Sequence, residues 1–265
     1  MSFSAQGLHA RRFKTSRTVL ALMLREMSTS YGRSPGGYLW AVLEPVGGLA
    51  VMTIAFSLAF RSPALGDNFP LFYATGYLPF MMYSDLAAKI GQSIRFSKPL
   101  LFYPAVTFVD AIIARLLLNA LTHLMVFYIL MSGIMLAFDT GNILNYPAIL
   151  NALGMALALG LGIGTLNCFL LMRFPIWEQV WVIISRPLFI ISAIFFLFES
   201  IPLPYRDYLW YNPLIHVTGE MRRGFYATYD GAYINPLYVY MISVVAFTIG
   251  LIFLSRYHRV LLNNR

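Results

Sequence analysis

Charge and cysteine are both scarce in this sequence of 265 residues. Charged side chains make up 11% of it, well below the roughly 25% of a soluble domain, whereas hydrophobic residues make up 59% and the mean hydropathy is +0.68. The single cysteine, Cys168, excludes an intrachain disulfide, and the four histidines are too scattered for a zinc site. We therefore expect a protein that lies in a lipid bilayer and holds no metal.

A phosphate-binding loop is also missing. Lys14, Lys89 and Lys98 are the only lysines, and none follows the glycine turn of a Gly-x-x-x-x-Gly-Lys-Ser/Thr sequence. The chain is thus not expected to hydrolyse ATP or to carry a cofactor of its own. The eleven carboxylates are spread singly, whereas a lipid-linked transferase in the membrane would need clustered acid, base or metal-binding groups. Such an enzyme is the alternative from a different functional class.

Six apolar runs are close to the ~20 residues that a helix needs to cross a bilayer. They cover residues 38–60, 70–90, 111–138, 148–172, 180–198 and 237–255. The sequence predicts an all-α integral membrane protein with one domain, 1–265. Spans one to five lie within 38–198, a segment with short re-entrant helices covers 199–236, and span six is 237–255. A secondary transporter would show interrupted helices in both halves, but only the segment after the fifth run is interrupted.

Most basic residues gather on one side of this six-span topology. They lie in the N-terminal tail, the second and fourth connections and the C-terminus. By the positive-inside rule both termini are expected in the cytoplasm. The net charge of +8 is explained by this bias and by contact with phospholipid, so no nucleic-acid partner is expected.

An amphipathic helix is predicted ahead of the first span, over residues 18–33. Leu20, Leu24, Met27 and Tyr31 recur at three- and four-residue intervals between polar residues, which suits a helix lying in the membrane interface. It is either an anchor that fixes topology or part of a gate. The candidate interface or gate residues are Arg25, Tyr31, Arg33 and Trp40.

Charged residues within the spans are costly and need a partner or a cavity. Asp85 and Lys89 are four apart and can pair on one helix face; Asp110 and Arg115 open the third span similarly. Arg186, just before Pro187, has no charge within one turn. It either extends back to the phospholipid headgroups or faces a pore.

The segment 199–236 is rich in aromatic residues. Leu214 to Tyr226 is predicted to form a helix too short to span, started by Asn212 and Pro213. The aromatic residues are either a belt at the headgroups or the lining of an exit, where their faces stack on sugar rings. The candidate substrate-path residues are Arg186, Tyr205, Tyr208, Trp210, Tyr211, Arg222, Arg223, Phe225 and Tyr226.

The sequence resembles the membrane subunit of ABC-2 type polysaccharide exporters. The resemblance rests on Asn212-Pro213-Leu214, on His216 and on the ending Glu220-x-x-Arg223-Gly-Phe-Tyr before the last span. Earlier in the chain, Arg25, Tyr31, Gly37, Trp40 and Pro45 match the family's entry to the first span loosely.

The resemblance implies a homodimeric channel in the bacterial inner membrane, driven by two copies of a separate ATPase subunit that binds ATP and Mg²⁺. The expected cargo is a lipid-linked acidic capsular polysaccharide, with O-antigen or teichoic acid as alternatives, and a periplasmic polysaccharide co-polymerase is a further partner. The family's ATPase contact falls on residues 91–104. The candidates there are Arg95, Phe96, Lys98, Leu100 and Leu101.

Overall fold

The computed structural model describes residues 14–30, 36–103, 106–138 and 143–263, and every regular element in these ranges is helical. The longer helices are α1 (Lys14–Ser30), α2 (Trp40–Ala59), α3 (Phe69–Gly91), α5 (Phe108–Ala137), α6 (Tyr146–Arg173), α7 (Trp177–Ile191), α9 (Pro213–Phe225) and α10 (Pro236–Asn263). The short ones are η1 (Gly37–Leu39), α4 (Ser93–Ser97), η2 (Phe198–Ser200) and α8 (Tyr205–Leu209).

Four helices in the described ranges are long and apolar enough to cross a membrane. They cover Gly37–Ala59, Phe108–Ala137, Tyr146–Arg173 and Pro236–His258. The second predicted span corresponds to α3, which has 23 residues and lies mostly buried between its neighbours. Two of its residues, Asp85 and Lys89, are charged.

The fifth predicted span, 180–198, differs most from the structure. Helix α7 ends at Ile191 after 15 residues, about 22 Å at 1.5 Å per residue, which is short of the ~30 Å hydrocarbon core. The chain then turns at Ala193, whose φ is 57°. Arg222 of α9 donates to the carbonyls of Ile194 and Phe196 that follow, so the backbone amides of a longer helix are not needed to satisfy them.

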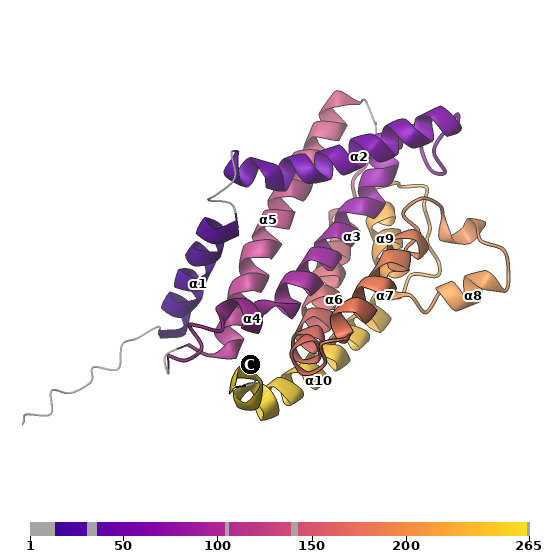
Figure 1. The fold of residues 1–265 in the computed structure, drawn as a ribbon. Helices are drawn as coiled ribbons and strands as arrows, with labels where there is room; N and C mark the ends of the chain where they lie inside the picture. The colour runs from indigo at the N-terminus through magenta and orange to yellow at the C-terminus, as the bar shows by residue number, and fades with distance from the viewer. Residues whose placement is uncertain (1–13, 31–35, 104–105, 139–142, 264–265) are drawn as a thin grey trace, which may run out of the picture.

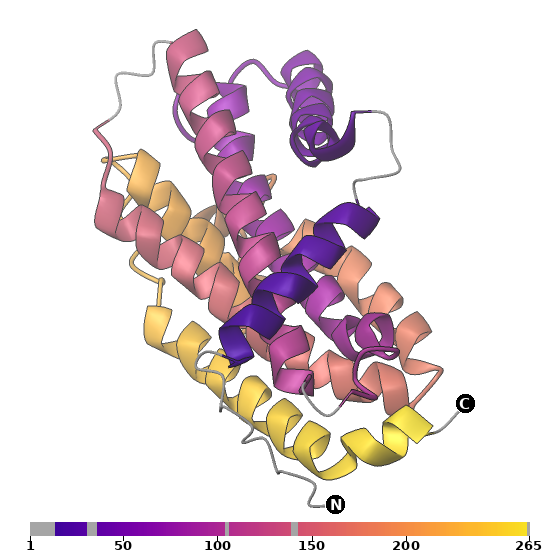
Figure 2. The ribbon, with the colours of Figure 1, turned by 90° about the vertical axis from the view of Figure 1, so that its left-hand side faces the viewer.

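Helix α6 lies at the centre of the bundle, between α3 and α10 (Figures 1 and 2). A Cβ on Gly160 would lie 2.8 Å from Leu86 Cβ, and one on Gly164 would lie 2.8 Å from Ile90 Cβ. A side chain at Gly162 would overlap the backbone of Ser243 on α10. These glycines therefore allow both neighbours to pack closely against α6 within the chain.

The N-terminal helix α1 lies along α5 (Figure 2). Val19, Leu22 and Glu26 are buried, whereas Leu20 and Leu24 of the predicted apolar face are more than half exposed. The face predicted to enter the membrane interface thus remains largely exposed, and the face that carries Val19, Leu22 and Glu26 docks on the bundle.

Of the two charged pairs suggested for α3 and α5, Asp85–Lys89 forms and Asp110–Arg115 does not. Asp85 lies 3.8 Å from Lys89, as its spacing predicted, and also 3.1 Å from Nε2 of His123 on α5. Asp110 does not pair with Arg115: its carboxylate forms a capping box with Thr107 at the start of α5. Arg115 instead pairs with Glu26 of α1, because α1 brings a carboxylate within 3.2 Å of it.

Candidate functional site

Helix α9 begins at a double contact made by Asn212. Its Oδ1 accepts a hydrogen bond from the Leu214 amide (3.1 Å), which caps the helix, and its Nδ2 donates to the carbonyl of Ile191 (3.1 Å). Pro213 occupies the first turn, where its missing N–H costs nothing. The start of α9 is thereby attached to the end of α7.

His216 connects the end of α8 to the start of α10. Its ring is fully buried, with Nε2 2.9 Å from the Trp210 carbonyl and Nδ1 3.2 Å from the Asn235 amide. Since Nδ1 accepts from that N–H, the proton of the neutral ring sits on Nε2 and is donated to Trp210. Burial lowers the pKa of His216 below its ordinary value.

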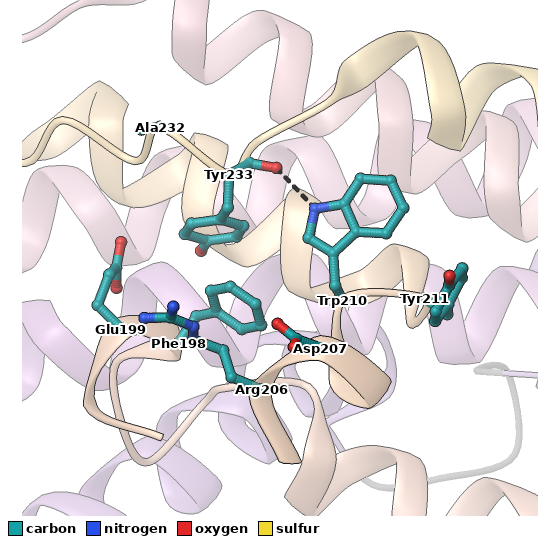
Figure 3. Close-up of a pocket in the computed structure, with 8 residues that line it drawn as sticks. All are labelled: Phe198, Glu199, Arg206, Asp207, Trp210, Tyr211, Ala232 and Tyr233. Carbon is teal, nitrogen blue, oxygen red and sulfur yellow. Dashed lines mark hydrogen bonds between the residues drawn. The ribbon is translucent and has the colours of Figure 1, made fainter. Parts of the chain in front are cut away.

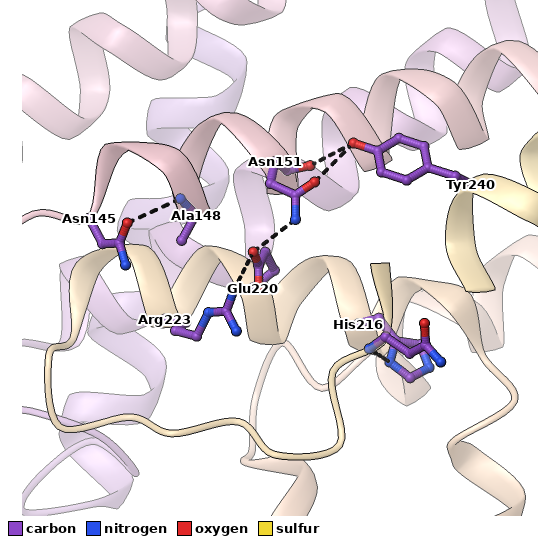
Figure 4. A network of polar contacts seen from close by, with 8 residues as sticks. Asn145, Ala148, Asn151, His216, Glu220, Arg223 and Tyr240 are labelled. Carbon is purple, nitrogen blue, oxygen red and sulfur yellow. Dashed lines mark hydrogen bonds and ion pairs between the residues drawn. The ribbon is translucent and has the colours of Figure 1, made fainter. Parts of the chain in front are cut away.

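Glu220 joins α9 to α6 and α10 through a buried polar network (Figure 4). Its Oε1 accepts hydrogen bonds from Asn151 Nδ2 (2.9 Å) and from Arg223 Nη2 (2.8 Å). Asn151 Oδ1 in turn accepts from the hydroxyl of Tyr240, at 3.0 Å. A charged group with 1% exposure is stable only with such partners.

Arg222 closes the turn that follows α7. It is fully buried, donates to the carbonyls of Phe196 (2.9 Å) and Ile194 (3.1 Å), and lies 4.4 Å from the centroid of the Phe72 ring. The prediction placed this side chain on a substrate path. In the structure its guanidinium is enclosed by carbonyl groups and an aromatic ring, so it stabilises the turn instead.

Most of the remaining residues at the end of α9 are packed inside the chain as well, with Arg223 as the exception. The Asn145 amide donates to the Gly224 carbonyl at 2.8 Å, and a Cβ on Gly224 would lie 3.1 Å from the Ile149 nitrogen, so only glycine fits this approach of α9 to α6. Phe225 and Tyr226, also predicted on the path, are buried. Arg223 is half-buried. Three predicted path residues, Arg222, Phe225 and Tyr226, are thus packed inside the chain, and the functional importance of this segment stays a prediction.

The exposed aromatic residues lie on and beside α8. Tyr205, Tyr208 and Tyr211 are each about two-thirds exposed or more, and Trp210 is half-buried. Beside them is a pocket of about 500 Å³ (Figure 3). It is lined by Phe198, Glu199, Arg206, Asp207, Trp210, Tyr211, Ala232 and Tyr233. Glu199, Arg206 and Asp207 were not among the predicted site residues, although they stand among the aromatics in the sequence.

Arg186 is exposed on α7, and it forms no ion pair with any described residue. It lies at a groove of about 280 Å³ between α3 and α7, whose other lining residues are mostly apolar. Arg186 is thus surrounded mostly by apolar side chains. This agrees with the sequence, in which no other charged residue lies within one helical turn of it.

The predicted ATPase contact falls on α4 and the turns after it. Arg95 is exposed and lies 3.2 Å from Glu178 at the start of α7. Phe96 packs against Arg115, whose guanidinium carbon lies 4.3 Å from the centroid of the Phe96 ring. Lys98, Leu100 and Leu101 are half-buried. Phe102 and Tyr103, which the prediction did not include, are the most exposed large side chains in this segment.

The predicted gate residues are only partly within the described ranges. Arg25 is half-buried, 5.3 Å from the Phe96 ring centroid, and Trp40 is exposed at the start of α2. Tyr31 and Arg33 lie outside the described residues. Among the residues that the structure describes, no three His, Cys, Asp or Glu side chains are placed to hold a metal ion.

Comparisons with known proteins cover almost the whole chain. No family model matches it. It is 33% identical over 234 residues to the polysialic acid transport protein KpsM of Escherichia coli, covering 88% of this chain and 91% of KpsM. Identity is 27% over 245 residues to CtrC of Neisseria meningitidis and 26% over 247 to BexB of Haemophilus influenzae, with 92% of each chain covered. Both are capsule polysaccharide export inner-membrane proteins.

The identity to KpsM over most of both chains, together with the membrane-length helices, shows the family of this chain. It belongs to the inner-membrane capsule polysaccharide export permeases, the transmembrane subunits of ABC exporters.

Proposed function

We propose that this chain forms the channel of an ATP-driven exporter that moves a lipid-linked acidic capsular polysaccharide across the bacterial inner membrane. The observation that carries the proposal is the similarity to KpsM, CtrC and BexB over 88–92% of the chain. O-antigen and teichoic acid are related cargoes that the same architecture could carry.

The channel is a homodimer in this proposal, and two copies of a separate ATPase subunit supply energy by hydrolysing ATP with Mg²⁺. The absence of a phosphate loop from the sequence supports this division of labour. The ATPase binds at α4 and the turns after it, where Arg95, Phe102 and Tyr103 are exposed. A periplasmic polysaccharide co-polymerase is the third component.

Six membrane crossings are assigned to α2, α3, α5, α6, α7 and α10, with both termini in the cytoplasm. Helix α3 is about 34 Å long at 1.5 Å per residue, and its two charges pair with each other. Helix α7 is shorter, so the turn that Arg222 binds completes the fifth crossing. The segment 199–236 then lies on the periplasmic side as a re-entrant unit, and α1 lies in the cytoplasmic interface.

Gene deletion in the native host tests this function. Loss of the chain should remove polysaccharide from the cell surface while polymer accumulates inside, and plasmid-borne wild type should restore both. The measurement is polymer in surface and cytoplasmic fractions. Unchanged surface polymer in the deletion strain would refute the proposal. Loss of polymer from both fractions would point to the lipid-linked transferase instead, because synthesis rather than export would have failed.

A further inference from the structure

The pocket beside α8 is built from three separate pieces of chain. Two residues, Phe198 and Glu199, come from η2, and two, Ala232 and Tyr233, come from the loop before α10. The other four come from α8 and the turn after it: Arg206, Asp207, Trp210 and Tyr211. Its volume of about 500 Å³ is within the ~300–1,000 Å³ of small-molecule sites. Buried side chains of α9 hold the chain at or beside each piece: Arg222 donates to the Phe196 carbonyl before η2, and His216 bonds to the Trp210 carbonyl and to the Asn235 amide.

The aromatic wall of the pocket is held in place before any ligand binds (Figure 3). The indole N–H of Trp210 donates to the Tyr233 carbonyl at 3.1 Å, and the Tyr211 ring stands edge-on to Trp210 at 5.6 Å. Phe198 packs on Tyr233 with ring centroids 4.2 Å apart. Because its donor is already used, Trp210 offers a ligand its ring rather than a hydrogen bond. A rigid aromatic surface loses little entropy on binding.

The rim of the pocket carries two carboxylates and one guanidinium. Glu199 accepts a hydrogen bond from the hydroxyl of Tyr229 at 3.1 Å, which leaves its other oxygen available. Neither Glu199 nor Asp207 forms an ion pair with Arg206 or another described residue. The rim therefore has free acceptors and a free donor, and its formal charge is negative although the chain as a whole is at +8.

We propose that this pocket binds one uncharged sugar ring, a neutral hexose or an N-acetylhexosamine unit of a glycan. The C–H face of such a ring is apolar and suits the aromatic wall, while its hydroxyls can donate to Glu199 and Asp207 and accept from Arg206. An acidic sugar would place its carboxylate beside two others of like charge. The inference rests on the proposed export function and refines it: the pocket selects the uncharged units of the polymer.

The test is a binding measurement on the full chain in lipid nanodiscs, with its four tryptophans replaced by 5-fluorotryptophan. The Trp210 signal in the ¹⁹F NMR spectrum is assigned from a Trp210→Phe sample. The probes are chitotriose and maltotriose, which are neutral, and trigalacturonate, which is acidic. A neutral trisaccharide should shift the Trp210 signal at millimolar concentration, and trigalacturonate should bind at least about tenfold more weakly because of like-charge repulsion.

Two matched variants separate the pocket from general charge effects. Asp207→Lys reverses the charge at the rim and should make trigalacturonate bind more tightly than in wild type. Asp230→Lys makes the same change at an exposed residue of the same segment that does not line the pocket, and it should leave both affinities unchanged. Equal effects of the two variants, or no Trp210 shift with any trisaccharide, would overturn the proposal.

Two further outcomes have definite meanings. A Trp210 shift with a tri-lysine peptide but with no sugar would overturn the proposal in favour of a docking site for a periplasmic protein. Sugar binding does not depend on the ATPase, so the two experiments can give different results. If no sugar binds but the deletion strain still loses surface polymer, the export function stands and the pocket proposal fails. If sugar binds but the deletion strain exports normally, the proposed function fails and the pocket remains.

Discussion

Glu26 of α1 lies 3.2 Å from the guanidinium of Arg115 on α5, and the two side chains are only 7% and 8% exposed. Arg115 also donates to the Lys89 carbonyl at the end of α3 and stacks on Phe96 of α4. One arginine therefore connects the N-terminal helix, two long helices and the segment proposed to contact the ATPase.

Replacing Glu26 by Gln should destabilise the chain by about 3–5 kcal/mol, because an uncompensated buried guanidinium remains. The double variant Glu26→Leu with Arg115→Met should lose less than the sum of the two single changes. Thermal unfolding midpoints in detergent measure both. Arg95→Gln is the control, since the Arg95–Glu178 pair is half exposed on both sides and such pairs contribute only about 0–1 kcal/mol. A Glu26→Gln midpoint equal to that of the control would show that α1 is not held by this pair.

Arg222 and Arg223 are adjacent but occupy opposite environments, which permits a matched test. Arg222→Lys should lower stability by about 2–4 kcal/mol, because a lysine cannot donate to the Ile194 and Phe196 carbonyls in the same fork. Arg223→Lys should be nearly neutral, since a half-exposed ammonium can still reach Glu220. The readout is the detergent unfolding midpoint of each variant. Equal midpoints would exclude a special role for the Arg222 fork.

The long helices could be predicted from the sequence because a helix that crosses a bilayer needs a long apolar run, which is visible in the sequence itself. The predicted runs 111–138 and 148–172 lie close to α5 and α6, where Thr107 and Asn145 also provide cap residues. The end of α7 could not be predicted in this way. The chain is apolar through Phe198, yet the helix ends at Ile191. Asn212 binds the Ile191 carbonyl and Arg222 binds the Ile194 carbonyl in the turn after it, and both side chains come more than 20 residues later.

Contacts between residues far apart in the sequence also explain why the buried and exposed residues of the candidate site could not be told apart from the sequence. A run of aromatic, Arg and Glu residues between two spans suggests the hypothesis of a functional segment, but it does not indicate which side chains face inward. Glu220 and Arg222 are buried because Asn151 of α6 and the turn after α7 supply partners. These contacts are long-range in sequence and leave no local pattern. Exposure of Tyr205 and Tyr208 likewise depends on how α8 lies at the edge of the bundle (Figure 1).

His216 makes stability pH-dependent in a defined direction. Burial lowers its pKa from 6.5 in the folded chain, so below about pH 6.5 the unfolded state binds a proton that the folded state resists. Stability contributed by the neutral ring is complete above that pH and is lost as the pH falls toward the folded pKa. Wild type should therefore have a lower unfolding midpoint at pH 5.5 than at pH 7.5, and His216→Gln should show a smaller difference. Equal differences would assign the pH effect to another group.

The ATPase contact is tested by charge reversal at Arg95 and Lys98. The double variant Arg95→Glu with Lys98→Glu should reduce co-purification of the ATPase subunit and stop export while the chain still inserts in the membrane. Arg256→Glu, an exposed change on α10, is the control and should leave co-purification intact. Normal export together with full recovery of the ATPase in the double variant would remove these residues from the interface.

Arg186 forms no ion pair with a described residue, and its neighbours in the groove are mostly apolar, so we expect its partner to be a lipid headgroup or the substrate. If it faces the path, Arg186→Leu should stop polymer at the cytoplasmic face with unchanged protein abundance, because an anionic linker or polymer loses its counter-charge. Arg186→Lys distinguishes the two roles. A lysine stem reaches the headgroups equally well, so full activity indicates a contact with lipid phosphate, whereas a site that uses the planar guanidinium would lose activity. Surface polymer normalised to protein abundance is the measurement, and wild-type export by Arg186→Leu would exclude this residue from the path.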